Sequence, residues 1–284
     1  MRYIVFGDTG GHFQQLYRGL LKAGMTKDLY LPENTIIIHC GDLIHKGPQS
    51  KEILEMVEKI RIINPGQWIQ IMGNHEAQYL GGVYFRKIGL LNEFSQSILK
   101  RWHNDGFLKF TYTITAGAII KTSNKEYILE DPLIFSHAGI SFPFWEKFLR
   151  NYAVEEYNNV ISSLPLEDIH KPGLMMGIER DISSPTGTIW SHGIHESWFL
   201  WNKINSITFN QAVGHIFPYL FHDIQGFFPG TDIEFQNIAE IHENELVTIA
   251  PLDNKKNNWM LFMDPGYENE AHNEVQPFVE IIAE

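Results

Sequence analysis

The first 75 residues alternate between short β-rich runs and helical patterns. Residues 2–6 and 68–72 are short β-rich runs that predict strands, and residues 35–38 form a continuous β-branched run, as expected of a strand buried on both faces. Residues 14–23 and 50–62, which lie between them, carry apolar side chains at helical spacing. Because a chain that repeats strand, loop and helix builds a sheet with helices packed on it, this order predicts an α/β fold.

Polar side chains follow the predicted strands at the point where each strand ends. Because ligands of α/β sheets bind at the carboxyl ends of the strands, we expect these polar side chains to meet in one site. A mixture of Asp, Asn and His suits Mn²⁺, Fe or Zn²⁺ better than a calcium site made of oxygens alone. The segments are Gly7-Asp8, Gly41-Asp42, Gly73-Asn74-His75-Glu76, Ser136-His137-Ala138-Gly139 and Gly214-His215.

The composition excludes several classes of protein. The 284 residues are 44% hydrophobic and 20% charged, as in a globular protein, and no apolar run approaches the roughly 20 residues of a membrane-spanning helix. The formal net charge of −12 disfavours coating of nucleic acid and binding to an anionic membrane. The single Cys40 excludes an internal disulfide and predicts a cytoplasmic location. The oligomeric state stays open.

The rest of the chain is less regular, and we interpret residues 1–284 as a single catalytic domain. Residues 140–205 are expected to form an inserted helical or loop cap, and the acidic tail from Glu268 onwards is expected to be a solvated terminus. Further elements are predicted as helices over 85–102 and 144–164 and as strands over 114–120, 127–129, 133–136, 246–250 and 259–263.

The strand-end segments resemble the signature of the calcineurin-like metallophosphoesterases, closest to the phosphoprotein phosphatase branch and its bacterial relatives. The resemblance runs from residue 3 to about 266, and its most specific parts are residues 41–48 and Gly73-Asn74-His75-Glu76. It implies an α/β (α+β) sandwich of two mixed β-sheets flanked by helices. It also implies two divalent metal ions at the sheet edge, with Mn²⁺ expected first and Fe or Zn²⁺ as alternatives.

The resemblance further implies a set of metal ligands. Asp42 would bridge the two metals, and Asp8 would bind the first. Asn74, His137 and His215 would bind the second metal.

The same resemblance implies the catalytic groups. A metal-bridging hydroxide would attack phosphorus while His75 protonates the leaving oxygen as general acid. Glu76 and His45 are the candidates to orient or tune His75. Lys46 and Asn74 are the candidates to bind the substrate phosphate.

The sequence departs from the family pattern at several positions. Gly10 stands where the family has a histidine that binds the first metal. His12 could supply that nitrogen; alternatively, the first metal is held with an extra water and His12 faces solvent from the start of a helix. His45-Lys46 replaces Asp-Arg, so the bidentate grip of arginine on phosphate is lost, and residues 185–215 contain no arginine that could act as a second clamp.

These features predict a metal-dependent phosphohydrolase that cleaves phosphomonoesters and resembles the protein phosphatases. Its partner would be a phosphorylated protein or small molecule. A nucleotide, dinucleoside polyphosphate or phosphodiester hydrolase is the alternative, and it would need aromatic side chains that stack on bases. A degenerate metal-binding scaffold is a second alternative, motivated by Gly10 and His45.

Overall fold

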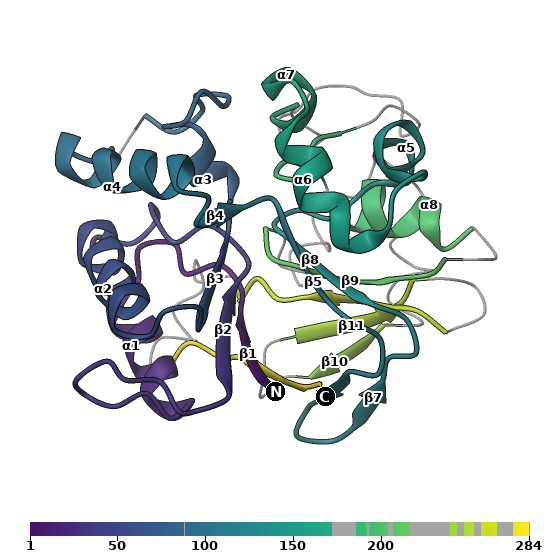
Figure 1. Ribbon diagram of the computed structural model, residues 1–284, viewed down its shortest axis with the longest axis horizontal. Coiled ribbons are helices and arrows are strands. Elements are labelled where there is room, and N and C mark those ends of the chain that lie inside the picture. The colour runs from purple at the N-terminus through teal and green to yellow at the C-terminus, as the bar shows by residue number, and fades with distance from the viewer. Residues whose placement is uncertain are drawn as a thin grey trace.

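The computed structural model of the chain describes residues 1–87, 89–171, 186–191, 193–203, 207–215, 239–242, 247–252, 257–265 and 275–283. Its N-terminal part follows the predicted alternation (Figure 1). Strands β1 (Arg2–Phe6), β2 (Thr35–His39) and β3 (Trp68–Ile71) lie side by side and parallel. Helices α1 (Phe13–Lys22) and α2 (Ser50–Ile63) connect them and lie on one side of this sheet. The predicted strands and helices of this region are therefore confirmed.

Two mixed sheets form the framework, which confirms the predicted sandwich. The first has the order β4-β3-β2-β1-β13-β6-β7, with β1 to β4 parallel and the remaining strands antiparallel to their neighbours. The second has the order β10-β11-β12-β9-β8-β5, with β8, β9 and β12 parallel. The remaining strands are β4 (Leu108–Lys109), β5 (Thr111–Ile114), β6 (Ile119–Lys121), β7 (Glu126–Ile128), β8 (Leu133–Ser136), β9 (Asn210–Val213), β10 (Glu240–His242), β11 (Val247–Pro251), β12 (Trp259–Phe262) and β13 (Val279–Ile282).

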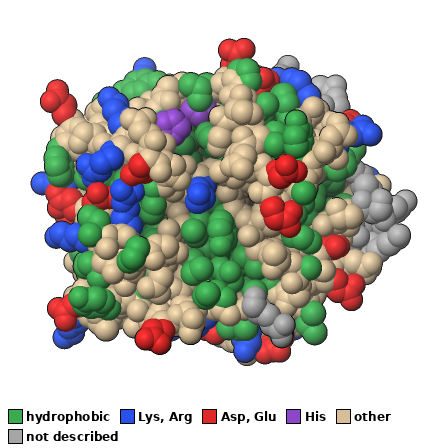
Figure 2. All heavy atoms as spheres, in the orientation of Figure 1, with side chains coloured by type: hydrophobic (Ala, Val, Ile, Leu, Met, Phe, Trp, Pro, Cys, Tyr) green, Lys and Arg blue, Asp and Glu red, His purple; other side chains and the backbone are tan. Residues whose placement is uncertain are grey.

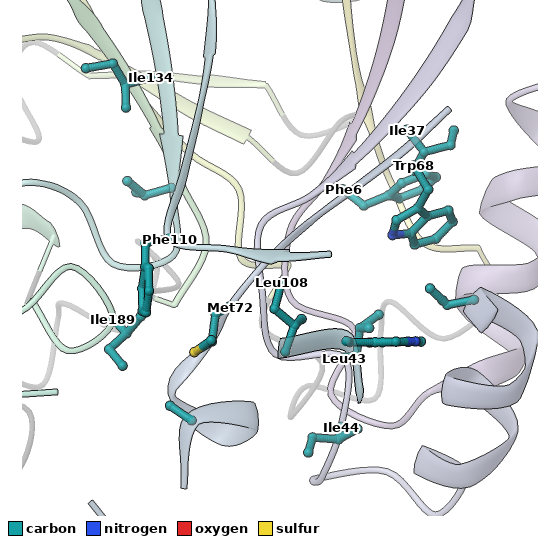
Figure 3. Close-up of a cluster of buried hydrophobic side chains, with 14 of the residues drawn as sticks. Phe6, Ile37, Leu43, Ile44, Trp68, Met72, Leu108, Phe110, Ile134 and Ile189 are labelled. Atoms are coloured by element: carbon teal, nitrogen blue, oxygen red, sulfur yellow. The ribbon is translucent and has the colours of Figure 1, made fainter. Parts of the chain in front are cut away.

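Alternation along the strands divides the core into two layers. Ile4 and Phe6 belong to the hydrophobic cluster beneath the helices, whereas Val5 between them belongs to the cluster between the sheets. In Figure 3, Phe6, Ile37 and Trp68 project from three adjacent strands to one side of the sheet. The continuous apolar runs of the sequence therefore arise because both faces of these strands are buried.

Short helices cover the second sheet in the upper right of Figure 1. This region includes most of the predicted cap, although residues 172–185, 192 and 204–206 of it lie outside the described part of the chain. The remaining helical segments are α3 (Asn74–Ala77), α4 (Glu93–Asn104), α5 (Phe142–Phe144), η1 (Trp145–Leu149), η2 (Val154–Glu156), α6 (Tyr157–Ser162), α7 (Leu166–Ile169), η4 (Gly193–Trp198) and α8 (Phe199–Trp201).

Three predicted elements in the middle of the chain are wrong in extent. The helix predicted over 85–102 begins only at Glu93, because the Asn92 side chain caps it by accepting a hydrogen bond from Ser95 N at 2.8 Å. The strand predicted over 114–120 is interrupted at Gly117, whose φ of +87° turns the chain between β5 and β6. The helix predicted over 144–164 is broken into η1, η2 and α6.

The C-terminal tail is also not a solvated terminus. Val279–Ile282 forms β13, which lies between β1 and β6 inside the first sheet. Val279 and Ile281 are fully buried between the sheets, so the alternation of apolar residues prevails over the acidic composition of the tail. The chain termini consequently meet, and Ala283 N donates a hydrogen bond to Met1 O at 3.0 Å.

The surface agrees with a globular chain of mixed charge. On the face shown in Figure 2, basic and acidic side chains are interspersed, with an apolar area below the centre. Across the described residues, no helix is long and apolar enough to cross a membrane.

Candidate metal centre

The polar strand ends meet at one edge of the two sheets. Loops after β1 and β2 carry Asp8 and Asp42, and helix α3, which follows β3, carries His75. Loops after β8 and β9 carry His137 and His215. Their backbones approach closely: a Cβ on Gly73 would lie 2.1 Å from Asp42 Oδ1, and one on Gly41 would lie 2.6 Å from His137 Nδ1. Side chains at these glycines would therefore displace the groups that face the site.

Strained backbone is concentrated here. Among the described residues, six that are not glycine have positive φ, and four of these are Asp42, His45, Lys46 and His215. Such conformations cost of the order of 1–3 kcal/mol each and persist where the surroundings impose them. The loops are thus held in conformations that serve the placement of their side chains.

Three predicted ligands form a compact cluster. One ligand atom each from Asp42, His137 and His215 lies within 4.8 Å of the others, and all three side chains are buried. Asn74 belongs to the same group, because its Oδ1 lies 3.1 Å from His137 Nε2. The structure therefore brings together the four residues that the resemblance assigned to the second metal and to the bridge.

The hydrogen bonding of His137 fits a cation at this cluster. Its Nδ1 lies 2.8 Å from Cys40 O, which can only accept, so Nδ1 carries the proton. Burial lowers the pKa of His137 to about 4, which leaves Nε2 without a proton. That nitrogen faces His215 Nδ1 at 3.1 Å, Asn74 Oδ1 at 3.1 Å and Asp42 Oδ1 at 3.4 Å. Nitrogen and oxygen donor atoms of four side chains thus converge, and His137, oriented by the carbonyl behind it, would be able to hold a cation there together with them.

The buried carboxyl groups also require a counter-charge. Burial raises the pKa of Asp42 to about 7, and it raises that of Glu76 to about 7 with a further contribution from Asp42. Burial, followed by the charges of Asp264 and Asp42, raises the pKa of Asp8 well above its usual value. Divalent ions would offset this concentration of negative charge.

The residues predicted for the first metal are placed less completely. Asp8 Oδ1 accepts a hydrogen bond from His215 N at 2.9 Å, and its buried Oδ2 has no hydrogen-bond partner in the described part of the chain. His12 lies half-buried at the N-terminal cap of α1, outside the three-residue cluster. A Cβ on Gly10 would lie 3.2 Å from Lys46 Cδ, so the lysine stem borders the place of the family histidine.

Glu76 and His45, the predicted partners of His75, take different positions. The Glu76 carboxylate accepts hydrogen bonds from Asp42 N, Leu43 N and Gly73 N, each at 2.9 Å, and so fixes two loops of the site. His45 instead contacts the acid candidate directly, with 2.9 Å between the Nδ1 atoms of His45 and His75.

Sequence reasoning missed several residues beside His75. The Phe85 ring lies edge-on to His75 at 5.1 Å and to Trp190 at 4.8 Å, forming an aromatic wall. Arg86 directs its charge at Asp42, His45 and His75, and its buried Nε has no hydrogen-bond partner within the described ranges. Phe85 and Arg86 lie in the segment that was predicted as helix, and that prediction concealed their role.

Comparison with known proteins gives a likeness of fold and a family. No curated protein matches the chain. A solved cold-active protein tyrosine phosphatase is 12% identical, with a TM-score of 0.50 over 98% of this chain and 73% of that chain. A protein-tyrosine phosphatase of a psychrophilic Shewanella species is 15% identical, with a TM-score of 0.46 over 76% of this chain and 65% of that chain. At 12% identity the likeness to the first of these concerns the fold alone.

The family model is decisive. The model of the calcineurin-like phosphoesterases matches residues 1–219, which is more than half of the 284 residues. The match includes all five strand-end segments of the site. The chain therefore belongs to the calcineurin-like phosphoesterase family and is a hydrolase of phosphoesters.

Proposed function

We propose that the chain is a dinuclear-metal phosphohydrolase that cleaves phosphomonoesters in the manner of a protein phosphatase. The observation that carries this proposal is the Asp42, His137 and His215 cluster, beside which His75 Nε2 lies 3.6 Å from Asp42 Oδ2. Because Asp42 is a proposed metal ligand, this contact places the proton donor His75 next to the metal centre, where the two could act on opposite sides of one phosphoryl group. Two divalent ions, with Mn²⁺ first, are the proposed cofactors.

The proposed ligand roles are those that the family resemblance implies, and the clustering of the side chains supports them. Asp42 would bridge the metals, and Asp8, whose Oδ2 has no partner among the described residues, would bind the first. Asn74, His137 and His215 would bind the second. When bound, the metals would supply an activated water and polarise the phosphoryl oxygens.

The protein's own groups would then bind phosphate and move one proton. Lys46 acts electrostatically on Asp8 and Asp42, and Arg86 on His75, so two cations face the centre from different loops. Arg86 is our candidate for the second phosphate clamp that the sequence left unassigned. His75 would give its Nε2 proton to the leaving oxygen.

The aromatic wall of Phe85 and Trp190 favours a second candidate substrate class. Trp190 lies 6.1 Å, ring to ring, from His215, so the wall borders both the acid and a metal ligand. Trp190 is only 2% exposed, so an aromatic group of a nucleotide or dinucleoside polyphosphate could pack on the half-buried Phe85 ring, which Trp190 supports. Trp190 belongs to residues 140–205, which we propose cap the site as an insertion in a single domain.

A substrate panel tests these alternatives. The chain is stripped of metal with chelator, reloaded with Mn²⁺, Zn²⁺ or Fe²⁺, and assayed with p-nitrophenyl phosphate, phosphopeptides, bis-p-nitrophenyl phosphate and dinucleoside polyphosphates. We expect metal-dependent hydrolysis of monoesters and phosphopeptides. Preference for diesters or dinucleotides would replace the proposal by the nucleotide alternative. Calorimetric metal binding without turnover of any substrate would favour the scaffold.

A further inference from the structure

A chain of hydrogen bonds joins His75 to the backbone of another loop. His75 Nδ1 lies 2.9 Å from His45 Nδ1, and His45 Nε2 lies 2.7 Å from Tyr79 Oη. Tyr79 Oη accepts a further hydrogen bond from Leu91 N at 3.1 Å. The His45 ring is thus contacted at both nitrogens, with ring centroids 4.8 Å from His75 and 5.5 Å from Tyr79.

The hydrogen bonds from His75 through His45 to Tyr79 must all run in one direction. One proton lies between the two Nδ1 atoms, so one ring donates and the other accepts. If His75 donates, the single proton of neutral His45 lies on Nε2 and is donated to Tyr79 Oη. If His45 donates, its Nε2 must accept the hydroxyl proton of Tyr79. A phenol can do either, whereas a carboxylate can only accept and an ammonium can only donate.

These hydrogen bonds also determine where Nε2 of His75 points. His75 N donates a hydrogen bond to Asp42 Oδ1 at 3.0 Å, which fixes the backbone. With Nδ1 held by His45, Nε2 faces Asp42 Oδ2 at 3.6 Å, on the metal side. His45 is held in turn, because its backbone has a φ of +70° and its N donates to Ser50 Oγ at 2.9 Å.

We propose that Tyr79 is a positioning residue for leaving-group protonation, because its hydroxyl fixes His45 and thereby holds His75 with the Nε2 proton toward the leaving oxygen. This inference rests on the proposed phosphohydrolase function. In the step, the Nε2–H bond of cationic His75 breaks as an O–H bond forms on the leaving oxygen. The ring becomes neutral, the leaving alkoxide becomes an alcohol, and the Nδ1 proton stays on the bond to His45.

Loss of this positioning has a characteristic kinetic effect. An alkyl leaving oxygen, as in phosphoserine, is strongly basic and depends on protonation in the transition state. A nitrophenolate leaves with little help from an acid. Mispositioned His75 should therefore slow alkyl substrates far more than p-nitrophenyl phosphate, whereas a general loss of structure would slow both alike.

The variant Tyr79→Phe tests the inference, because it removes only the hydroxyl. In the Mn²⁺-loaded enzyme, we expect kcat on a phosphoserine peptide to fall about tenfold more than kcat on p-nitrophenyl phosphate, with KM unchanged. This is a fraction of the roughly 10²–10⁴-fold that a general acid contributes. Tyr84→Phe is the matched control, because Tyr84 is 54% exposed in the loop that follows α3, and it should change neither rate.

A second measurement does not depend on activity. In the metal-free protein at pH 8, the ring ¹⁵N chemical shifts of His75 should differ between the wild type and Tyr79→Phe, because the variant removes the hydroxyl that holds His45. Equal loss on both substrates, or unchanged ring ¹⁵N shifts of His75, would overturn the role of Tyr79 while the wild type remains an active phosphohydrolase. Absence of hydrolysis by the wild type would instead refute the proposed function, and the catalytic role of Tyr79 with it.

Discussion

The substitution Asp42→Asn should stabilise the metal-free protein while abolishing its function. The Asp42 carboxyl is fully buried, and burial raises its pKa from 3.8 to about 7. At about 1.4 kcal/mol per pKa unit, keeping this group ionised at pH 8 costs the fold of the order of 4 kcal/mol. Asparagine carries no charge, and its Oδ1 can still accept the hydrogen bond from His75 N.

The sign of the effect gives it a specific pH dependence. A carboxyl whose pKa is raised by folding does not lower the free energy of unfolding when the pH is below its pKa in the unfolded chain. It lowers that free energy by the full amount when the pH is above its pKa in the folded protein. The advantage of the variant should therefore be largest above pH 7. It should fall to about 1.5 kcal/mol at pH 5, where the folded carboxyl is protonated.

Thermal unfolding with chelator and with Mn²⁺ measures both parts of the prediction. In chelator at pH 8, we expect the variant to melt roughly 10 °C above the wild type, at about 2–4 °C per kcal/mol for a large domain. At a Mn²⁺ concentration of a hundred times Kd, metal binding should raise the free energy of unfolding of the wild type by about 2.7 kcal/mol and that of the variant by little. Turnover of p-nitrophenyl phosphate should nearly vanish.

The control for Asp42→Asn is the same substitution at an exposed aspartate. Asp28→Asn changes an exposed carboxylate and should alter stability by less than about 0.5 kcal/mol in either condition. A variant that melts below the wild type in chelator would show that the Asp42 charge does not strain the metal-free fold. Near-normal activity, or a retained Mn²⁺ shift, would refute the bridging role of Asp42.

Three further predictions concern other parts of the molecule. His12→Ala should lower the metal content toward one ion per chain by elemental analysis, while an unchanged content would leave His12 as a helix-terminal residue. Arg86→Ala should raise KM for p-nitrophenyl phosphate about tenfold if the guanidinium binds phosphate, at about 1.4 kcal/mol per tenfold, whereas Lys87→Ala, an exposed neighbour, should not. Trp102→Ala should cost about 3–5 kcal/mol in urea unfolding, because the fully buried indole also donates to Glu58 Oε2 at 2.6 Å; a loss below 1 kcal/mol would contradict its place in the core.

Several parts of the site and fold were predictable because they depend on local pattern. The strands at 2–6, 35–38 and 68–72 are runs that can be stable only when covered on both faces, and they were confirmed. Polar residues directly after neighbouring parallel strands lie at the same sheet edge, so Asp8 and Asp42, which follow β1 and β2, could be expected to lie close together. That His137 joins them from the second sheet depended on how the two sheets pack.

Other parts depended on contacts between distant residues. Val279 pairs with Val5 because a gap beside β1 accepts an antiparallel strand, and nothing in the acidic tail indicated that partner. Arg86 lies in a loop that was predicted as helix. Tyr79 reaches His75 only through His45, which comes from the loop after β2.

The sequence by itself determined the kinds of donor at the site and the strand ends that carry them. Only the tertiary structure decided how those donors are oriented. The left-handed backbone of Asp42 and His45 turns their side chains toward the centre, and the Tyr79 hydroxyl meets His45 from a loop 34 residues away. Local periodicity encodes burial, whereas direction within a loop is set by long-range packing and hydrogen bonds that form only in the folded chain.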